Sequence, residues 1–226
     1  MFAGRSTRCR TGGGTKGSSC ETRGAAFIGW CSPVLDVTAC LVTRGDQPKM
    51  MERIRESLIF DRVIVWNNSL QPDWKTAGRY MAALLADTEL VYWQDDDVIV
   101  PQETQTELVE AYEWPIVANY GHGDNPDGYD DLPLVCGGAV ASKVAAWEAI
   151  GRYAAHHLLD VDFRYDCDFA VGVLYPTFKT VYLPFDINLA VAQHPSRLVN
   201  QPWQKDTKLR VTERARAIRD RELVAA

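Results

Sequence analysis

Three consecutive carboxylates, Asp95-Asp96-Asp97, are the side chains of this chain best suited to chemistry. Apolar residues 90–93 and 98–100 flank them, so the acids leave the hydrophobic core at the end of an expected strand. Adjacent carboxylates repel one another unless a cation or a hydrogen-bonded ligand offsets their charge. Mn²⁺ and Mg²⁺ prefer oxygen ligands and would join such acids to a diphosphate. The triplet therefore predicts a site for a metal and a diphosphate, with a solvated acidic turn as the alternative.

The three side chains of the triplet are expected to have different roles. Successive side chains of a strand point to opposite faces, so Asp95 and Asp97 are expected on one side and Asp96 on the other. We expect Asp97 to hold the metal, and Asp95 to bind either the metal or a sugar hydroxyl. The metal would stabilise the charge that builds on a leaving diphosphate, which requires no tuned proton donor.

Two further groups of residues could complete such a site. Asp166 and Asp168 precede a short apolar helix and could act as a base, a nucleophile or a group that positions an acceptor; an ordinary helix N-cap is the alternative. His194 and Arg197 follow the last expected strand. Arg197 could pair with a diphosphate, and His194 could donate a hydrogen bond or bind the metal, although such a pair is more often a surface feature.

The elements that must position these residues alternate between strand and helix. Expected strands cover residues 35–43, 60–66, 90–93, 115–119 and 179–183, and expected helices lie between them, at 48–58, 74–86, 103–112 and 147–153. This alternation predicts an α/β fold, a mostly parallel sheet with helices on both faces. Ligands of such sheets collect outside the carboxyl ends of the strands. Arg44, Asn67, Asn68 and the triplet all follow expected strands and should meet at that edge.

Length and composition place these elements in one domain. With 226 residues, 46% of them hydrophobic, the chain can bury one substantial core. We expect a disordered, basic, Gly/Ser-rich tail over 1–33, the main domain over 34–204 and a charged helix over 205–226. A net charge of −6 argues against a nucleic-acid duplex as partner. No apolar run reaches the ~18 to 20 residues of a membrane span and no secretory signal is evident, which predicts a cytoplasmic protein.

Several segments, in their order along the chain, resemble the exostosin-like glycosyltransferases, family sixty-four of the GT-A fold, and more loosely family two. Residues 41–44 (LVTR) resemble that family's first strand, which ends in an Arg near the nucleotide. Residues 63–68 (VIVWNN) resemble its second strand, and 93–98 (WQDDDV) resemble its DxD motif in the DDD form. Arg79 falls where a helix Arg precedes the third strand. WNN and DDD in that order are the most specific pieces.

Later segments extend the resemblance. Gly137-Gly138 is similar to a small-residue segment that lets sugars approach the backbone, Asp168 matches the family's functional aspartate, and His194 and Arg197 fall near a late His and Arg. The resemblance implies a GT-A fold with a Rossmann-like nucleotide-binding half. It implies a transferase that moves a hexosyl group from a nucleotide-sugar, a UDP-sugar above all, to a hydroxyl of a glycan, protein or small molecule, with Mn²⁺ or Mg²⁺ on the diphosphate.

The residues implied for that reaction fall into three sets. The nucleotide-sugar would contact Thr43, Arg44, Asn67, Asn68, Arg79, Asp95, Asp96, Gly137, Gly138 and Arg197. The metal would be held by Asp97, Asp95 and His194. Asp168 and Asp166 would be the catalytic acids, with Asp168 as base in an inverting enzyme or as a stabilising group in a retaining one.

Two other functions use the same residues. A nucleotidyltransferase would join a sugar phosphate to a nucleotide on the same sheet, but such enzymes place a basic Gly-rich loop after the first strand, and residues 43–46 (TRGD) are a poor version of it. A carbohydrate-binding or partner-binding module would have kept the fold and lost the reaction. Intact carboxylates in both acidic groups favour an enzyme over such a module.

Overall fold

The computed structural model describes residues 36–112, 116–119, 138–175, 178–181, 186–187 and 201–225. All of them belong to one compact unit, Leu35–Ala226. The tail expected over residues 1–33 lies outside the described residues. None of the helices in the described ranges is long and apolar enough to cross a membrane.

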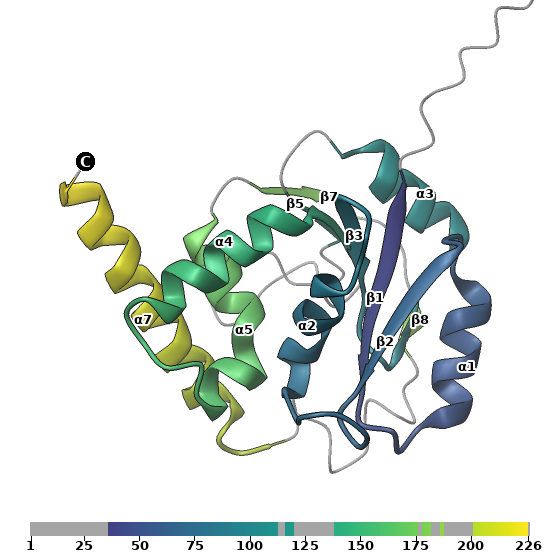
Figure 1. Ribbon diagram of the computed structural model, residues 1–226, viewed down its shortest axis with the longest axis horizontal. Helices are drawn as coiled ribbons and strands as arrows, with labels where there is room; N and C mark the ends of the chain where they lie inside the picture. Colours follow the sequence, from purple (N-terminus) through teal and green to yellow (C-terminus); the bar gives the residue numbers. More distant parts are fainter. Residues whose placement is uncertain are drawn as a thin grey trace, which may run out of the picture. The chain divides into compact units, whose positions relative to one another are not determined.

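Strands and helices alternate through the first half of this unit (Figure 1). In chain order the elements are β1 (Val37–Thr43), α1 (Pro48–Ser57), β2 (Arg62–Asn67), the 3-10 helix η1 (Lys75–Ala77), α2 (Gly78–Leu84), β3 (Leu90–Trp93), β4 (Val98–Ile99), α3 (Gln102–Glu110), β5 (Ile116–Asn119), β6 (Ala139–Ser142), α4 (Lys143–Ala154), α5 (Val161–Leu174), β7 (Phe178–Val181), β8 (Asp186–Ile187) and α7 (Gln204–Ala225). The strands predicted before the triplet are therefore present, within two residues of their expected starts.

The main sheet is mostly parallel, as predicted. Its strands lie in the order β2-β1-β3-β6-β5-β7. β1 pairs in parallel with β2 and β3, and β5 pairs in parallel with β7, whereas β6 is antiparallel to both of its neighbours. Neither β6 nor its antiparallel direction was predicted, because a short apolar segment has the same pattern in either direction. β4 and β8 form a separate antiparallel pair.

Helices cover both faces of the sheet, which confirms the predicted α/β fold. Alternate residues of β3 enter different cores: Val91 and Trp93 pack with the buried residues of α2, α4, α5 and α7, whereas Tyr92 packs on the side of α3. In β1, Leu41 contacts the buried face of α1. Figure 1 shows α1 and α3 on one side of the strands and α2, α4 and α5 on the other.

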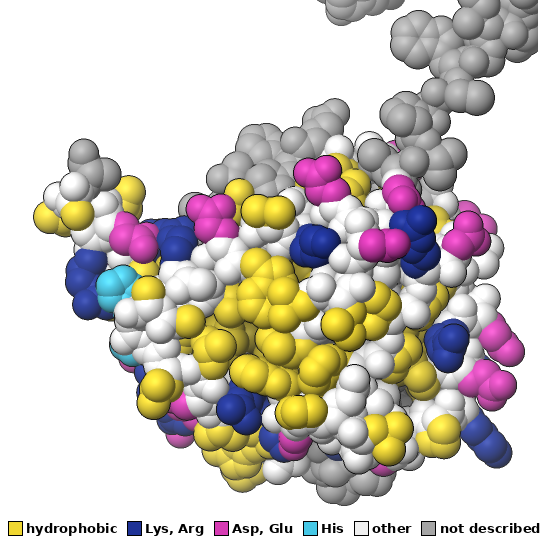
Figure 2. Space-filling view, in the orientation of Figure 1, with side chains coloured by type: hydrophobic (Ala, Val, Ile, Leu, Met, Phe, Trp, Pro, Cys, Tyr) yellow, Lys and Arg dark blue, Asp and Glu magenta, His cyan; other side chains and the backbone are white. Residues whose placement is uncertain are grey.

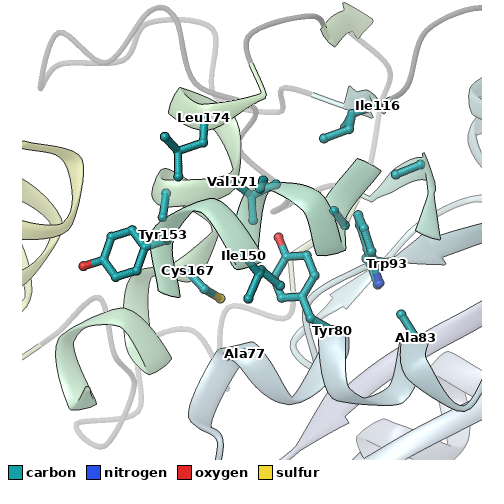
Figure 3. Packing of buried hydrophobic residues seen from close by; sticks show 14 of the residues in the cluster. Ala77, Tyr80, Ala83, Trp93, Ile116, Ile150, Tyr153, Cys167, Val171 and Leu174 are labelled. Carbon is teal, nitrogen blue, oxygen red and sulfur yellow. The ribbon is translucent and has the colours of Figure 1, made fainter. Parts of the chain in front are cut away.

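Tyr80 of α2 lies at the centre of the larger core (Figure 3). Its ring meets that of Trp93 edge to face, with centroids 4.9 Å apart and an interplanar angle of 60°. Cys167 and Val171 of α5 belong to the same cluster. Tyr80 therefore joins the end of β3 to α5, and both of these elements carry candidate site residues.

The helix predicted over residues 74–86 differs in detail from the observed one. It begins with one turn of 3-10 helix and continues as α2 from Gly78. A Cβ on Gly78 would lie 2.6 Å from Val42 Cγ2 and 2.7 Å from Trp66 Cδ1, so glycine allows the helix to start close to β1 and β2. At the end of this helix Leu84 and Leu85 are 54% and 62% exposed. Figure 2 shows hydrophobic side chains gathered over the α2 and α4 region of this face.

The charged terminal helix α7 packs along α5. Val211, Ala215 and Ile218 are its fully buried apolar residues, whereas Leu209 is 44% exposed. Arg210 pairs with Asp162 of α5 at 2.8 Å. α7 thus packs against α5, the helix that carries Asp166 and Asp168.

Candidate functional site

The carboxyl edge of the sheet brings most of the predicted residues together. β1, β2 and β3 are parallel and so end at one edge, where Thr43 is paired with Asn67. The antiparallel β6 begins at that same edge, with Ala139 opposite Trp93. The residues that follow these strands, or precede β6, therefore share this edge: Arg44, Asn68, Asp95, Asp96, Asp97 and Gly138.

A buried glutamine braces the turn that holds the acidic triplet. Gln94 has no exposed surface. Tyr92 Oη donates a hydrogen bond to Gln94 Oε1 at 2.8 Å, and Gln94 Nε2 donates to the carbonyl oxygen of Val98 at 2.9 Å. Gln94 was not predicted as a site residue. Its position, a polar residue between an apolar strand and three acids, could have indicated a role. It fixes where the triplet leaves the core.

The acidic triplet is not part of a strand, so the prediction that its side chains alternate between two faces is wrong. β3 ends at Trp93, and residues 96–97 form a turn, so the extended geometry does not continue through the acids. Asp97 is only 4% exposed, whereas Asp96 and Asp95 are half-buried. Asp97 therefore lies against the protein, and its two neighbours lie closer to solvent.

Arg79 joins the two acidic groups that the sequence presented separately. Its side chain is 2% exposed, and its Nη2 donates to Asp95 Oδ1 at 2.6 Å. Its Nη1 lies 3.7 Å from Asp168 Oδ2, and its Nε donates to the carbonyl oxygen of Thr76 at 3.2 Å. Burial opposes its charge, but Asp168 and Asp95 raise the pKa of Arg79 well above its ordinary value. Arg79 was predicted to contact a nucleotide-sugar; here its guanidinium holds two protein carboxylates.

Asp168 is held by a second donor. Tyr80 Oη donates to Asp168 Oδ1 at 2.5 Å, while Arg79 approaches the other carboxylate oxygen. Burial raises the pKa of Asp168 above its ordinary value, although Arg79 and Tyr80 both act to lower it. Oδ1 thus accepts a hydrogen bond from Tyr80, whereas Oδ2 faces the charge of Arg79 at 3.7 Å, beyond hydrogen-bond distance. Tyr80 follows Arg79 in α2 and was not predicted from the sequence.

A kink in α5 directs Asp168 towards these partners. The helix begins much earlier than predicted: Asp160 is its N-cap and accepts from the Phe163 amide at 3.0 Å, so the N-cap alternative for Asp166 and Asp168 is wrong. At Asp166 the backbone leaves helical geometry, with φ −124° and ψ 31°. Thr76 Oγ1 lies 2.9 and 2.5 Å from the two preceding carbonyl oxygens, those of residues 164 and 165. A side chain inserted into the backbone ladder kinks a helix in this way.

Asp166 faces away from the triplet. Its Oδ1 accepts a hydrogen bond from Gln204 Nε2 of α7 at 3.3 Å. Its side chain is 3% exposed, and within the described residues its Oδ2 has no hydrogen-bond partner. Burial raises the pKa of Asp166 to about 7. The two predicted catalytic acids therefore lie in different surroundings, one against Arg79 and the other against α7.

The two asparagines of the WNN segment shape the loop after β2. Asn67 Oδ1 accepts from the amide and hydroxyl of Ser69, at 2.9 and 2.7 Å. Asn68 Oδ1 accepts from the Trp74 amide at 3.0 Å, and its Nδ2 donates to the carbonyl oxygen of Lys75 at 3.0 Å. These bonds fix the path of the chain into η1 and so the position of Thr76.

The loop after β1 places a cation at the edge. Thr43 Oγ1 accepts from the Gly45 amide at 3.1 Å, and Gly45 has φ +84° with a Cβ position only 2.5 Å from Ser69 Oγ. Arg44 is 38% exposed and pairs with Asp46 at 2.8 Å. Arg44 is thus the basic side chain that this loop presents to solvent.

The position before β6 has no room for a side chain and is occupied by Gly138. Its φ is +101°, and a Cβ there would lie 2.8 Å from Tyr92 Oη. The glycine therefore makes room for the tyrosine that braces Gln94. Gly137, His194 and Arg197 lie outside the described residues.

Among the described residues, no three His, Cys, Asp or Glu side chains are grouped so as to hold a metal ion. The metal set predicted from the sequence includes His194, which lies outside the described residues, so that set stays a prediction; of its other members, Asp95 is paired with Arg79. Mg²⁺, however, commonly binds one or two carboxylates and completes its coordination with substrate phosphates and water. The triplet fits a divalent cation in that form.

Comparison with known proteins finds similarity only among solved structures. No protein-family model and no curated protein matches the chain. The bifunctional IspDF from Campylobacter jejuni is 11% identical with a TM-score of 0.44, and the match covers 66% of this chain and 50% of that one. A 4-diphosphocytidyl-2C-methyl-D-erythritol synthase from Anaerococcus prevotii is 14% identical (TM-score 0.42; 79% and 78% covered). HddC from Yersinia pseudotuberculosis, complexed with GMP-PN, is 13% identical (TM-score 0.38; 78% and 97% covered).

These findings correct the prediction of a hexosyltransferase. None of the three structures is named as a glycosyltransferase, and no family model supports the exostosin-like resemblance. The hexosyltransferase prediction is therefore wrong. The chain spans half the length of the bifunctional protein, and at 11 to 14% identity the similarity is one of fold alone.

Proposed function

We propose that this protein is a nucleotidyltransferase that joins a phosphorylated sugar or polyol to a nucleotide at the carboxyl edge of its sheet. The observation that carries the proposal is the bridge from Asp95 through Arg79 to Asp168. Because Tyr80 donates to Oδ1 of Asp168 and the charge of Arg79 lies 3.7 Å from Oδ2, we infer that this carboxylate balances the buried arginine and does not remove a proton from a substrate. A reaction whose nucleophile carries its own negative charge fits this arrangement better than transfer to a neutral hydroxyl.

Nucleotidyl transfer has such a nucleophile. An oxygen of the sugar phosphate attacks the α-phosphorus of a nucleoside triphosphate, the bond to the β-phosphate oxygen breaks, and pyrophosphate leaves. A phosphate monoester has its second pKa near 6, so at neutral pH it is already mostly ionised and needs no base. The protein's task is then to align two anionic substrates and to offset the charge on the leaving group.

The residues at the edge divide this task. Arg44 is placed to meet the triphosphate, since it is exposed beside the ends of β1 and β2. Asp97, with Asp96, would hold a divalent cation, which supplies positive charge to the phosphates when bound. Arg79 is a positioning residue: it holds Asp95 and Asp168 and keeps their charges from repelling the substrates.

The experiment is a screen for pyrophosphate release. The protein is incubated with Mg²⁺ or Mn²⁺, each of the four common ribonucleoside triphosphates and a panel of sugar and polyol phosphates; products are identified by mass spectrometry. We expect pyrophosphate to appear only when both substrates are present, and Asp97→Asn to reduce the rate at least tenfold. Asp61→Asn, an exposed acid at the opposite end of β2, should not change it. Failure of every triphosphate to bind with either metal would overturn the proposal.

A further inference from the structure

Aromatic rings and cations gather beside the kink of α5. Arg164 Cζ lies 4.6 Å from the ring centroid of Trp74, and Lys75 Nζ lies 5.4 Å from that of Tyr165. The Tyr165 ring in turn lies 4.8 Å from the ring of Trp203, just before α7. These five residues, from three segments far apart in the sequence, are called the aromatic–cationic cluster below.

The cluster lies at the surface rather than in the core. Trp203 is 38% exposed and the side chain of Lys75 is 30% exposed. Trp74, Arg164 and Tyr165 are half-buried. Partly exposed rings next to charged groups are typical of ligand sites, because a ring offers an apolar face while a few polar groups set the ligand's orientation.

The cluster carries an excess of positive charge. Lys75 is paired with Asp73, whose side chain is 45% exposed. Arg164 Nε donates to the carbonyl oxygen of Leu159 at 3.1 Å, and its charge interacts with that of the same Asp73. Two cations therefore face one carboxylate, on a protein whose net charge is −6. A dianionic phosphate would be attracted to this excess of positive charge.

One residue links the cluster to the site at the sheet edge. The Thr76 hydroxyl contacts the carbonyl oxygens of Arg164 and Tyr165, and the Thr76 carbonyl oxygen accepts from Arg79 Nε. Through residues 164 and 165 the cluster adjoins the part of α5 that carries Asp168, whereas the acidic triplet contains Asp95, the other carboxylate that pairs with Arg79. The cluster and the triplet are thus connected through Arg79, which is itself buried.

We propose that the aromatic–cationic cluster binds the phosphorylated sugar or polyol whose phosphate acts as nucleophile. The carbon face of the sugar packs on the rings of Tyr165 and Trp203, and Lys75 and Arg164 bind the phosphate. The nucleoside triphosphate then lies over Arg44 and the triplet. This inference rests on the proposed function for the reaction, but the binding of a sugar phosphate to the cluster can be measured without any turnover.

The binding test uses isothermal titration calorimetry with glucose 1-phosphate, ribose 5-phosphate and erythritol 4-phosphate. We expect at least one of them to bind more tightly than both its unphosphorylated form and inorganic phosphate. Lys75→Met and Trp203→Leu should each weaken that binding about tenfold. Arg53→Met, which removes an exposed cation from α1 on the opposite face of the sheet, is the matched control and should leave it unchanged.

Asp73→Asn separates a ligand site from a merely structural cluster. The asparagine keeps the oxygen that accepts from the Lys75 amide at 3.1 Å, so the turn is retained, but it removes the anion that competes for the Lys75 ammonium. We expect it to tighten sugar-phosphate binding several-fold. Unchanged or weaker binding in Asp73→Asn, or no binding of any of the three phosphates to the unaltered protein, would overturn the proposal.

Parallel titrations with the four nucleoside triphosphates distinguish the remaining outcomes. If Trp203→Leu weakens triphosphate binding and leaves sugar-phosphate binding intact, the rings hold a nucleobase and the inference is wrong. If pyrophosphate release proceeds with a sugar phosphate but is insensitive to Lys75→Met and Trp203→Leu, the inference fails while the proposed function stands. If the cluster variants change sugar-phosphate binding as expected but no triphosphate is consumed, the proposed function fails and the binding site stands.

Discussion

Arg79 Nη2 lies 2.6 Å from Asp95 Oδ1, and this contact ties the end of β3 to α2 inside the protein. The arginine is almost fully buried, and its Nη1 lies 3.7 Å from Asp168 Oδ2 of α5. Three elements that carry candidate residues therefore meet on one guanidinium. Since each of the partners is charged, the stability of the site depends on the charge of Arg79.

Replacing Arg79 with methionine should destabilise the protein. The change leaves Asp95 and Asp168 as partly buried, unpaired charges, and removing one partner of such a group costs about 3 to 5 kcal/mol. Arg79→Lys should be intermediate, because an ammonium cannot reach both carboxylates in the fork geometry of a guanidinium. Urea unfolding measures the loss. Arg62→Met, which removes exposed pairs with Asp36 and Asp87, is the control and should change the unfolding free energy by less than about 1 kcal/mol. Equal losses in the two variants would contradict this account.

Asp166 should make the stability depend on pH. Burial raises its pKa in the folded protein to about 7, above the ordinary value of 3.8, so the folded state keeps a proton that the unfolded chain has lost. The contribution of Asp166 to stability is therefore greatest below pH 4, falls as the pH rises towards 7 and is constant above it, with a total change on the order of 4 kcal/mol at most.

Asp166→Asn tests this dependence directly, because asparagine cannot titrate. Relative to the unaltered protein, it should raise the unfolding free energy at pH 8 and have much less effect at pH 4.5. Urea denaturation at both pH values measures the difference, with the exposed Asp61→Asn as control. A variant that is equally stabilised or destabilised at both pH values would show that the buried charge is not the cause.

Two glycines should respond in opposite ways to alanine. At Gly138, φ is +101° and the new Cβ would lie 2.8 Å from Tyr92 Oη, so Gly138→Ala should cost about 2 to 3 kcal/mol. Gly151 lies inside α4 with nothing within 4 Å of its Cβ position, and Gly151→Ala should stabilise by roughly 0.5 to 1 kcal/mol. Thermal unfolding of both variants provides the comparison, and a shift of the same sign in each would count against the argument.

The sequence was sufficient for the fold and for the edge at which the site lies. The alternation of apolar strands and amphipathic helices predicts the sheet, and parallel strands bring Asn68 and the triplet to one edge by geometry alone. The direction of β6 and the early start of α5 were missed, since neither leaves a periodic signal. The roles of Arg79 and Tyr80 were also hidden: nothing in the spacing of α2 and α5 shows that both side chains turn inward to Asp168.

The hydroxyl of Thr76 should matter more than its exposure suggests, because it holds the kink of α5 at the carbonyl oxygens of residues 164 and 165. Thr76→Val keeps the shape and removes the hydrogen bonds, which should cost about 2 kcal/mol of stability and move Asp168 relative to Arg79. Thr76→Ser should restore most of it. Thr106→Val, which loses a solvent-exposed bond to the Gln102 carbonyl oxygen, is the control and should cost less than about 0.5 kcal/mol. Urea unfolding gives the stabilities, and pyrophosphate release gives the activities. If Thr76→Val and Thr106→Val behave alike, the kink does not depend on the hydroxyl and another contact must place Asp168.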